Sequence, residues 1–237
     1  MELEGKVAMI TGGSKGLGAA LARRFTEEGA AVSLCARGAE ELDEIAGELE
    51  GHGGGVLTAT ADVSSEADVK AWVAATLERF GRVDVLVNNA SVLGPRVGIE
   101  EYPLDDWRTV VDVNLTGAFL CARESIAALR ETKGAMIHVS SGVGDHGRPY
   151  WGAYSASKNG LEALSQMLAG ELKDDGIRSN AVDPGSMRTE MRAAAYPDED
   201  PDTLPRPGEV TDVFVYLASD AARDVTGQRF RAKDFGG

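Results

Sequence analysis

The sequence predicts an α/β fold with a single, doubly wound, mainly parallel sheet of about seven strands and helices on both of its faces. Short runs rich in β-branched and other apolar residues alternate along the chain with longer segments whose apolar residues recur at helical spacing. The chain has 237 residues, of which 43% are hydrophobic, and this is enough for one domain with a sizeable core. We therefore expect residues 1–237 to form a single domain.

The expected strands lie between amphipathic segments that predict helices. In chain order the strands are Val7–Thr11, Ala31–Ala36, Val56–Ala61, Val83–Asn88, Ala135–Ser140, Ser179–Asp183 and Arg229–Ala232. Ser65 followed by Asp68 is typical of a helix N-cap and its partner. A late helix is expected at 210–218. Residues 196–209 are dense in proline and acid and lack periodicity, so they predict a loop.

Composition and charge exclude several classes of protein. The net charge of -14 disfavours binding to nucleic acid or to anionic membranes, whose phosphates would be repelled. No apolar run approaches the ~20 residues of a membrane span. The acidic start MELE does not resemble a signal peptide, so we expect a cytoplasmic protein. Cys35, Cys121 and the three scattered histidines lack metal-ligand spacing, so no metal site is expected.

A glycine-rich turn follows the first expected strand and opens the first expected helix. Its residues, spaced Gly-x-x-x-Gly-x-Gly, are Gly12, Gly13, Ser14, Lys15, Gly16, Leu17 and Gly18. Glycines allow backbone N–H groups to approach a pyrophosphate, whose charge a helix N-terminus favours. A tight turn is the alternative interpretation, but the position after an N-terminal strand favours dinucleotide binding in a Rossmann fold.

The end of the second expected strand indicates which dinucleotide is bound. An acidic residue there accepts a hydrogen bond from the ribose 2'-hydroxyl of NAD, whereas an arginine accommodates the 2'-phosphate of NADP. Here Arg37 stands at this end and no acid follows until Glu40. Lys15 in the glycine-rich turn adds a second cation. Both could be solvated surface charges, but on a chain this acidic they favour NADP.

Tyr154 and Lys158 stand four positions apart in a segment with helical spacing, so their side chains are expected on one helix face. A free tyrosine titrates near pH ~10, and a neighbouring cation lowers that pKa. Such a tyrosine can donate a proton to a developing alkoxide or remove one from an alcohol. An exposed pair with no catalytic role is the alternative, because Tyr-x-x-x-Lys also arises by chance.

Ser141 precedes Tyr154 by thirteen residues and follows a strand-like run. With the glycine-rich turn and the Tyr/Lys pair, this arrangement resembles the classical short-chain dehydrogenase/reductase family, and the resemblance extends from Lys6 to Gly237. It implies reversible hydride transfer between a nicotinamide and a carbonyl or secondary alcohol of a small molecule. Ser141, rather than Ser140, would hold the substrate oxygen, and Lys158 would also bond the nicotinamide ribose.

The resemblance assigns further residues. Asn114 would help to hold a water in a proton relay, although it could instead be a hydrogen-bonded residue of the core. Asp62, with the backbone at Val63, would hold the adenine, although Asp62 could equally be a turn residue. Family positions that contact the cofactor are also occupied by Asn89, Ala90, Pro184, Gly185, Met187 and Thr189. Ser91 replaces a family glycine, which makes close backbone approach there less certain.

The family also suggests an oligomer and a substrate pocket. The apolar helices near 114–130 and 154–172 would form the interface of a homodimer or homotetramer, and a short substrate loop would lie around 190–209. His146, Arg148, Tyr150 and Trp151 would line the pocket, or be ordinary loop residues. His138, within a strand, is expected to be a core residue.

Two other functions stay open. One is a 3-oxoacyl-(acyl carrier protein) reductase, against which we weigh the lack of a basic patch near the site for an acidic carrier. The other is a non-catalytic, dinucleotide-sensing regulatory protein, against which all four catalytic positions are filled.

Overall fold

The computed structural model describes residues 1–235 and contains all seven expected strands. Gly236 and Gly237, included in the single-domain and family predictions, lie outside the described residues. The predicted fold class is confirmed, and the strand ends differ by two residues at most. The strands are β1 (Val7–Thr11), β2 (Ala31–Ala36), β3 (Val56–Thr60), β4 (Val85–Asn88), β5 (Ala135–Val139), β6 (Arg178–Asp183) and β7 (Arg229–Arg231).

The sheet has the strand order β3-β2-β1-β4-β5-β6-β7, and every neighbouring pair is parallel. Strands β1 and β4 lie side by side in register, with Ala8 opposite Val85 and Ile10 opposite Val87. The chain returns from the β3 edge to the middle of the sheet at this pair, and strand order reverses there. In open α/β sheets, ligands bind where the order reverses, outside the carboxyl ends of the strands.

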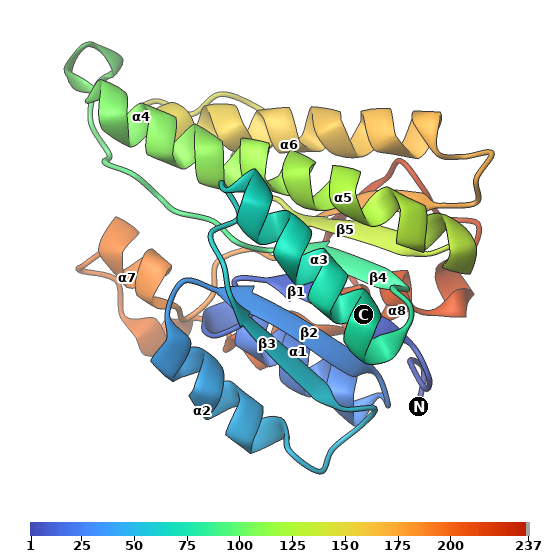
Figure 1. Ribbon diagram of the computed structural model, residues 1–237. Coiled ribbons are helices and arrows are strands. Elements are labelled where there is room, and N and C mark those ends of the chain that lie inside the picture. The colour runs from blue at the N-terminus through green and yellow to red at the C-terminus, as the bar shows by residue number, and fades with distance from the viewer. Residues whose placement is uncertain (236–237) are drawn as a thin grey trace.

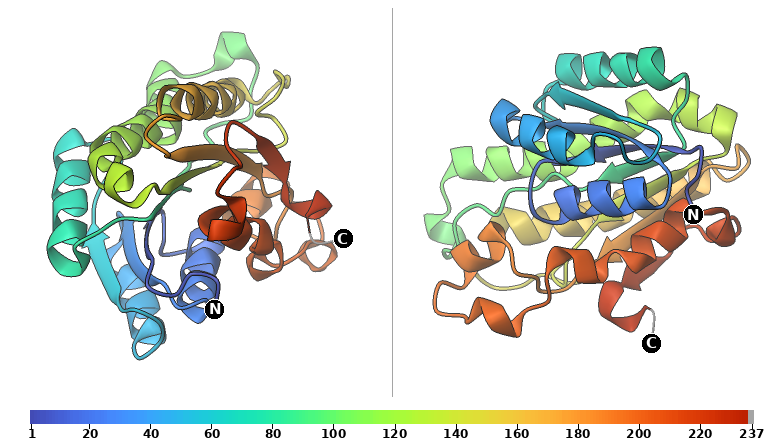
Figure 2. Two further views of the ribbon diagram at one scale, coloured as in Figure 1. Left: turned by 90° about the vertical axis from the view of Figure 1, so that its right-hand side faces the viewer. Right: turned by 90° about the horizontal axis from the view of Figure 1, so that it is seen from below.

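Helices cover both faces of the sheet (Figures 1 and 2). One face carries α1 (Gly16–Glu27), α2 (Ala39–Leu49) and α8 (Asp212–Ala218). The other carries α3 (Glu66–Phe80), α4 (Leu104–Val111), α5 (Gly117–Thr132) and α6 (Gly152–Glu171). The predicted cap of α3 is present, since the backbone N–H of Asp68 donates to Ser65 Oγ at 3.3 Å. No helix in the described part of the chain is long and apolar enough to cross a membrane.

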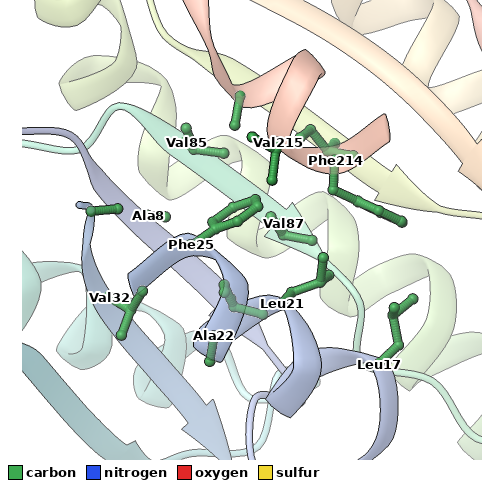
Figure 3. Packing of buried hydrophobic residues seen from close by; sticks show 14 of the residues in the cluster. Ala8, Leu17, Leu21, Ala22, Phe25, Val32, Val85, Val87, Phe214 and Val215 are labelled. Atoms are coloured by element: carbon green, nitrogen blue, oxygen red, sulfur yellow. The ribbon is translucent and has the colours of Figure 1, made fainter. Parts of the chain in front are cut away.

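The core between the sheet and its first face holds the glycine-rich turn in place. Figure 3 shows Phe25 of α1 among Val85 and Val87 of β4 and Phe214 and Val215 of α8. All five are buried. Full burial of a side chain of this size contributes about 1.5–3 kcal/mol. This packing therefore fixes α1 against the sheet, and with it the glycine-rich turn that leads into the helix.

The region around 190–209 has more structure than the predicted loop. Thr189 caps a short helix, α7 (Glu190–Ala195), and its hydroxyl accepts from the backbone N–H of Arg192 at 3.2 Å. Single 3-10 turns follow at Pro201–Thr203 and Pro207–Val210. In Figure 1, α7 lies apart from the two helical layers, at one end of the sheet. The sequence analysis did not predict this helix because its six residues are too few to show a helical periodicity.

Candidate active site

A cavity of about 1210 Å³ lies where β1 to β6 end, and its wall is built from the residues that follow these strands. It thus occupies the place expected for a ligand of such a sheet. The predicted site residues that line it are Gly12, Ser14, Lys15, Gly16, Leu17, Arg37, Asp62, Val63, Asn89, Ala90, Ser141, Tyr154, Lys158, Pro184, Gly185, Met187 and Thr189. Among the predicted residues, Gly18 and Asn114 lie behind this wall.

The glycine-rich turn lacks side chains at positions where its backbone lies close to neighbouring segments. A Cβ added to Gly12 would stand 3.1 Å from Cα of Ala90. Gly18 has a different part: a Cβ there would stand 2.1 Å from the carbonyl oxygen of Gly12, so this glycine lets helix α1 pack against the turn. The turn and the start of α1 fit the phosphates of a dinucleotide.

Asn89 joins this turn to the middle of the sheet. Its Nδ2 donates to the carbonyl oxygens of Thr11 at 2.8 Å and Gly12 at 3.1 Å. The hydroxyl of Thr11 accepts in return from the backbone N–H groups of Asn89 and Ala90, both at 2.9 Å. The Asn89 side chain therefore holds the glycine-rich turn in its conformation.

The two predicted cations that line the cavity, Lys15 and Arg37, differ in their ion-pair partners. Lys15 forms an ion pair with Glu41 at 2.9 Å, a partner that the sequence pattern did not predict. This contact raises the pKa of Lys15 and lowers that of Glu41. Arg37 has no carboxylate within ion-pair distance among residues 1–235 and lowers the pKa of nearby Asp62. Arg37, not Lys15, is thus the free cation of the two.

Asp62 has the structural role that the sequence left open. Its Oδ1 accepts from the backbone N–H of Ser64 at 2.9 Å and from the Ser64 hydroxyl at 2.7 Å, which lowers the pKa of the carboxyl. The carboxyl group therefore stabilises the turn after β3. Because Asp62 and Val63 also line the cavity, the turn presents them to its contents.

Ser141, Tyr154 and Lys158 meet on the wall formed by the end of β5 and the start of α6. Tyr154 and Lys158 share one face of α6, and the ammonium lies 5.7 Å from the centre of the tyrosine ring. Lys158 Nζ donates to the carbonyl oxygen of Val139 at 2.7 Å. Both side chains are buried.

The expected lowering of the pKa of Tyr154 by Lys158 is wrong for this structure. Burial raises the pKa of Tyr154, and the hydroxyls of Ser141 and Ser91 oppose this increase. Burial also lowers the pKa of Lys158 to about 8, and the charge of Glu162 opposes that change. Desolvation of Tyr154 therefore outweighs the effect of the two serine hydroxyls, and the phenol is held in its protonated, hydrogen-donating form.

Asn114 lies behind the catalytic wall, in a π-helical turn (Asp112–Thr116) between α4 and α5. Its Oδ1 accepts from the backbone N–H of Val92 at 2.8 Å, and its Nδ2 donates to the Val92 carbonyl at 3.0 Å and to Ser157 Oγ at 3.1 Å. The side chain thus fixes the segment after β4 that enters the substrate end of the cavity. A relay through water stays a prediction.

Ser91 is a residue of the cavity wall whose effect on Tyr154 the sequence analysis did not predict. Its hydroxyl is buried and lies near the phenol of Tyr154, whose pKa it lowers. Ser91 lines the same cavity. The motif marked this position as a departure from glycine, but only the tertiary structure brings its hydroxyl near the phenol.

Arg229 of β7 was also missed, because nothing near it in the sequence signals a site. Its Nη2 donates to the carbonyl oxygen of Ser141 at 3.0 Å, and its Nε donates to Glu162 at 2.9 Å. Asp183 and Asp145 lie within 3.4 Å of the same guanidinium. Arg229 therefore ties the loop that carries Ser141 to α6 and β6.

The remaining titratable candidates are structural. His138 is buried between Asn88 and Ser179, each 3.2 Å from a ring nitrogen, and burial lowers its pKa to about 4. It is the core residue that was predicted. Cys35 and Cys121 are both buried thiols. Within residues 1–235, no group of three or more potential ligands could hold a metal ion.

Comparisons with known proteins agree with this geometry. The family model for short chain dehydrogenases matches residues 6–200. Glucose 1-dehydrogenase 2 of Bacillus subtilis is 35% identical over 241 residues and covers 95% of this chain and 92% of its own. The 3-oxoacyl-(acyl-carrier-protein) reductase FabG of Thermotoga maritima is 36% identical over 96% of both chains.

A solved structure of a short chain dehydrogenase from Shigella flexneri, complexed with NADP, matches with a TM-score of 0.92 and 30% identity over 98% of both chains. The similarity to these relatives covers nearly the whole length of this chain. It therefore includes the parallel sheet, the glycine-rich turn and the wall that carries Ser141, Tyr154 and Lys158. This chain belongs to the short-chain dehydrogenase/reductase family of oxidoreductases, which act on CH–OH and C=O groups.

Proposed function

We propose that this protein is an NADP(H)-dependent oxidoreductase that interconverts a carbonyl and a secondary alcohol of a small molecule. One observation supports this most strongly: Ser141, Tyr154 and Lys158 line the same cavity as the glycine-rich turn and Arg37. A dinucleotide that extends from the turn along this cavity would bring its nicotinamide to the catalytic wall.

When bound, the nicotinamide supplies or accepts the hydride; the protein supplies orientation and protons. The hydroxyl of Ser141 would hold the substrate oxygen, and Tyr154 would donate its proton to that oxygen during reduction. Burial keeps the phenol protonated for this step. Lys158 would return a proton toward Tyr154, and its pKa of about 8 allows it to exchange protons near neutral pH. Asn114 would complete the path to water.

The remaining cofactor contacts follow from the lining of the cavity. Gly12, Ser14, Gly16 and Leu17 would bind the pyrophosphate at the start of α1. Asp62 and Val63 would border the adenine, with Asn89 and Ala90 near the ribose. Pro184, Gly185, Met187 and Thr189 would place the nicotinamide.

The preference for NADP rests on Arg37. Its guanidinium lines the cavity and has no carboxylate partner in residues 1–235, so it can pair with a 2'-phosphate. Lys15 contributes less because Glu41 already holds it. Arg37→Asp is expected to raise KM for NADPH at least tenfold and to favour NADH. Unchanged preference in steady-state kinetics with both cofactors would refute this assignment.

The main test is turnover. Purified protein is incubated with NADPH and a panel of ketones, aldehydes, quinones and 3-oxoacyl esters, and nicotinamide absorbance is followed. Tyr154→Phe should lower kcat by at least a hundredfold, as expected for loss of a general acid, with nearly unchanged NADPH binding. Full activity of Tyr154→Phe would overturn the assigned proton donor. Tight NADPH binding without any turnover would support the regulatory alternative.

A 3-oxoacyl-(acyl carrier protein) reductase is the second candidate, since the Thermotoga maritima relative bears that name. The sequence analysis expected no basic patch near the site; Arg96, Arg148 and Arg192 lie at the rings of Trp151 and Tyr196, and Glu199 pairs with Arg192. Away from the site, Arg130 is paired with Asp175 at 2.8 Å. Faster turnover of a carrier-bound 3-oxoacyl group than of its free thioester would favour this candidate.

We further propose a single-domain protein that forms a homodimer or homotetramer in the cytoplasm. One sheet contains all seven described strands, which supports the single domain. Phe119 of α5 and Met167 of α6 are large apolar side chains exposed on the helices expected at the interface. Two unpaired thiols suit a reducing compartment.

A further inference from the structure

The substrate end of the cavity, beyond Tyr154, has an apolar and aromatic wall. Val92, Leu93, Val143, Trp151 and Met191 all line the cavity, and all belong to or pack against one buried cluster that includes Tyr154. The ring centres of Trp151 and Tyr154 are 5.7 Å apart. A flat or apolar substrate body would therefore lie beside Trp151 while its carbonyl reaches Tyr154.

Three guanidinium groups surround this wall. Arg148 lies 5.3 Å and Arg96 4.8 Å from the centre of the Trp151 ring. Arg96 also lies 4.6 Å from the centre of the Tyr196 ring, on which Arg192 stacks at 3.9 Å. We call these five residues the cation–aromatic stack. It concentrates positive charge at the substrate end of a chain whose net charge is -14.

The three arginines differ in what else they bind. Arg192 pairs with Glu199 through both Nε and Nη2, and Arg96 donates to the carbonyl oxygen of Ala195. Arg148 lines the cavity, and its guanidinium has neither an ion pair nor a hydrogen bond to any other of the described residues. Most other arginines in residues 1–235 are paired; Arg37 at the opposite end of the cavity is another exception, so Arg148 is the unpaired arginine of the cation–aromatic stack that lines the cavity.

A guanidinium stacked on an indole keeps its N–H groups free at the edge of its plane. Stacking also restricts the side chain, so less conformational entropy is lost when a ligand binds. The free edge matches a carboxylate, which can accept two parallel hydrogen bonds. Asp145, the nearest acid along this loop, is already engaged by His146 and Arg229.

The distances also limit the size of the ligand. The guanidinium of Arg148 lies 5.3 Å from the centre of the Trp151 ring, and that centre lies 5.7 Å from the centre of the Tyr154 ring. The distance from the guanidinium to the Tyr154 ring therefore cannot exceed the sum of these two distances. One aromatic ring with substituents at opposite ends spans such a gap. A small molecule can thus touch the phenol and the guanidinium at once.

We propose that the substrate carries a carboxylate in addition to its carbonyl or alcohol, and that Arg148 binds this carboxylate at the rim of the cavity while the reacting oxygen lies on Tyr154. This inference rests on the proposed oxidoreductase function, whose substrate class it names. Phosphate or sulfonate groups share the chemistry, and the test below includes a sulfonate.

The test uses a matched pair of aldehydes, 4-formylbenzoate and its neutral methyl ester, with NADPH. For the wild type, kcat/KM should be at least tenfold higher for the acid, mainly through KM. Arg148→Gln should remove this preference, so that acid and ester are reduced with similar kcat/KM. Arg79→Gln is the control, because Arg79 also stacks on an aromatic ring, at 5.2 Å from Phe80, but does not line the cavity. It should keep the preference.

A binding measurement separates this inference from the proposed function. Calorimetry with enzyme and NADP should show benzoate binding at least tenfold tighter than benzamide, and Arg148→Gln should abolish the difference. Equal binding of benzoate and benzamide by the wild type, or an acid preference that survives Arg148→Gln, would overturn the inference. Absent hydride transfer with an intact benzoate preference would count against the oxidoreductase instead. Tighter binding of 4-formylbenzenesulfonate than of 4-formylbenzoate would overturn the carboxylate and indicate that the substrate carries a sulfonate.

Discussion

Replacing Lys158 by methionine should make the fold more stable at neutral pH while it disables the proposed proton transfer. Lys158 is 2% exposed, and burial lowers its pKa from 10.5 to about 8. At ~1.4 kcal/mol for each pKa unit, the protonated lysine destabilises the native state by about 3 kcal/mol. Methionine removes that charge but leaves the carbonyl of Val139 without its donor, which costs about 1 kcal/mol. The net gain is about 2 kcal/mol.

The pH dependence gives this prediction its sign. Below the folded pKa of about 8, lysine is protonated in both states, and the native state carries the full penalty. Between this value and 10.5, the unfolded chain binds the proton but the folded chain does not, so wild-type stability rises with pH. The advantage of Lys158→Met should therefore shrink from neutral to alkaline pH and reverse before 10.5, where the charge penalty is nearly gone and the lost hydrogen bond to Val139 remains.

Urea unfolding followed by tryptophan fluorescence, near neutral pH and again near the alkaline limit, measures both free energies. Lys173→Met is the control, since Lys173 is exposed just after α6 and should change stability by no more than about 0.5 kcal/mol. A Lys158→Met variant that is less stable than wild type at neutral pH, or whose difference from wild type is the same at both pH values, would refute the assigned desolvation.

Two further predictions concern single residues around the site. Gly18→Ala should destabilise the fold by about 2 kcal/mol in urea unfolding, because its methyl would stand 2.1 Å from a backbone oxygen; Gly47→Ala, with nothing within 4 Å, should not be destabilising and serves as its control. Ser91→Gly should raise the pKa of Tyr154, so the rising limb of the kcat/KM profile for alcohol oxidation should move to higher pH. A limb that stays in place, or moves equally in Ser140→Ala, would contradict the role of Ser91.

Local patterns predicted the framework because burial in a parallel sheet constrains each strand by itself. The run at Val7–Thr11 is buried at every position, and so is that at Ala135–Val139, which favours a nearly continuous apolar run; the exceptions, Thr11 and His138, are hydrogen-bonded. The glycine-rich turn was predictable for a similar reason, since its conformation and spacing leave few choices of residue. The helix α7 was not, since six residues carry too little periodicity to predict it.

By itself, then, the sequence determined the sheet, the glycine-rich turn and many of the side chains that line the cavity. The tertiary structure alone decided their ionisation and pairing: Lys15 is held by Glu41, Arg148 pairs with no other residue of 1–235, and burial raises rather than lowers the pKa of Tyr154. The physical reason is that strand and turn formation depend mainly on neighbours along the chain. A charge responds instead to every dipole and apolar group around it, including groups from distant segments.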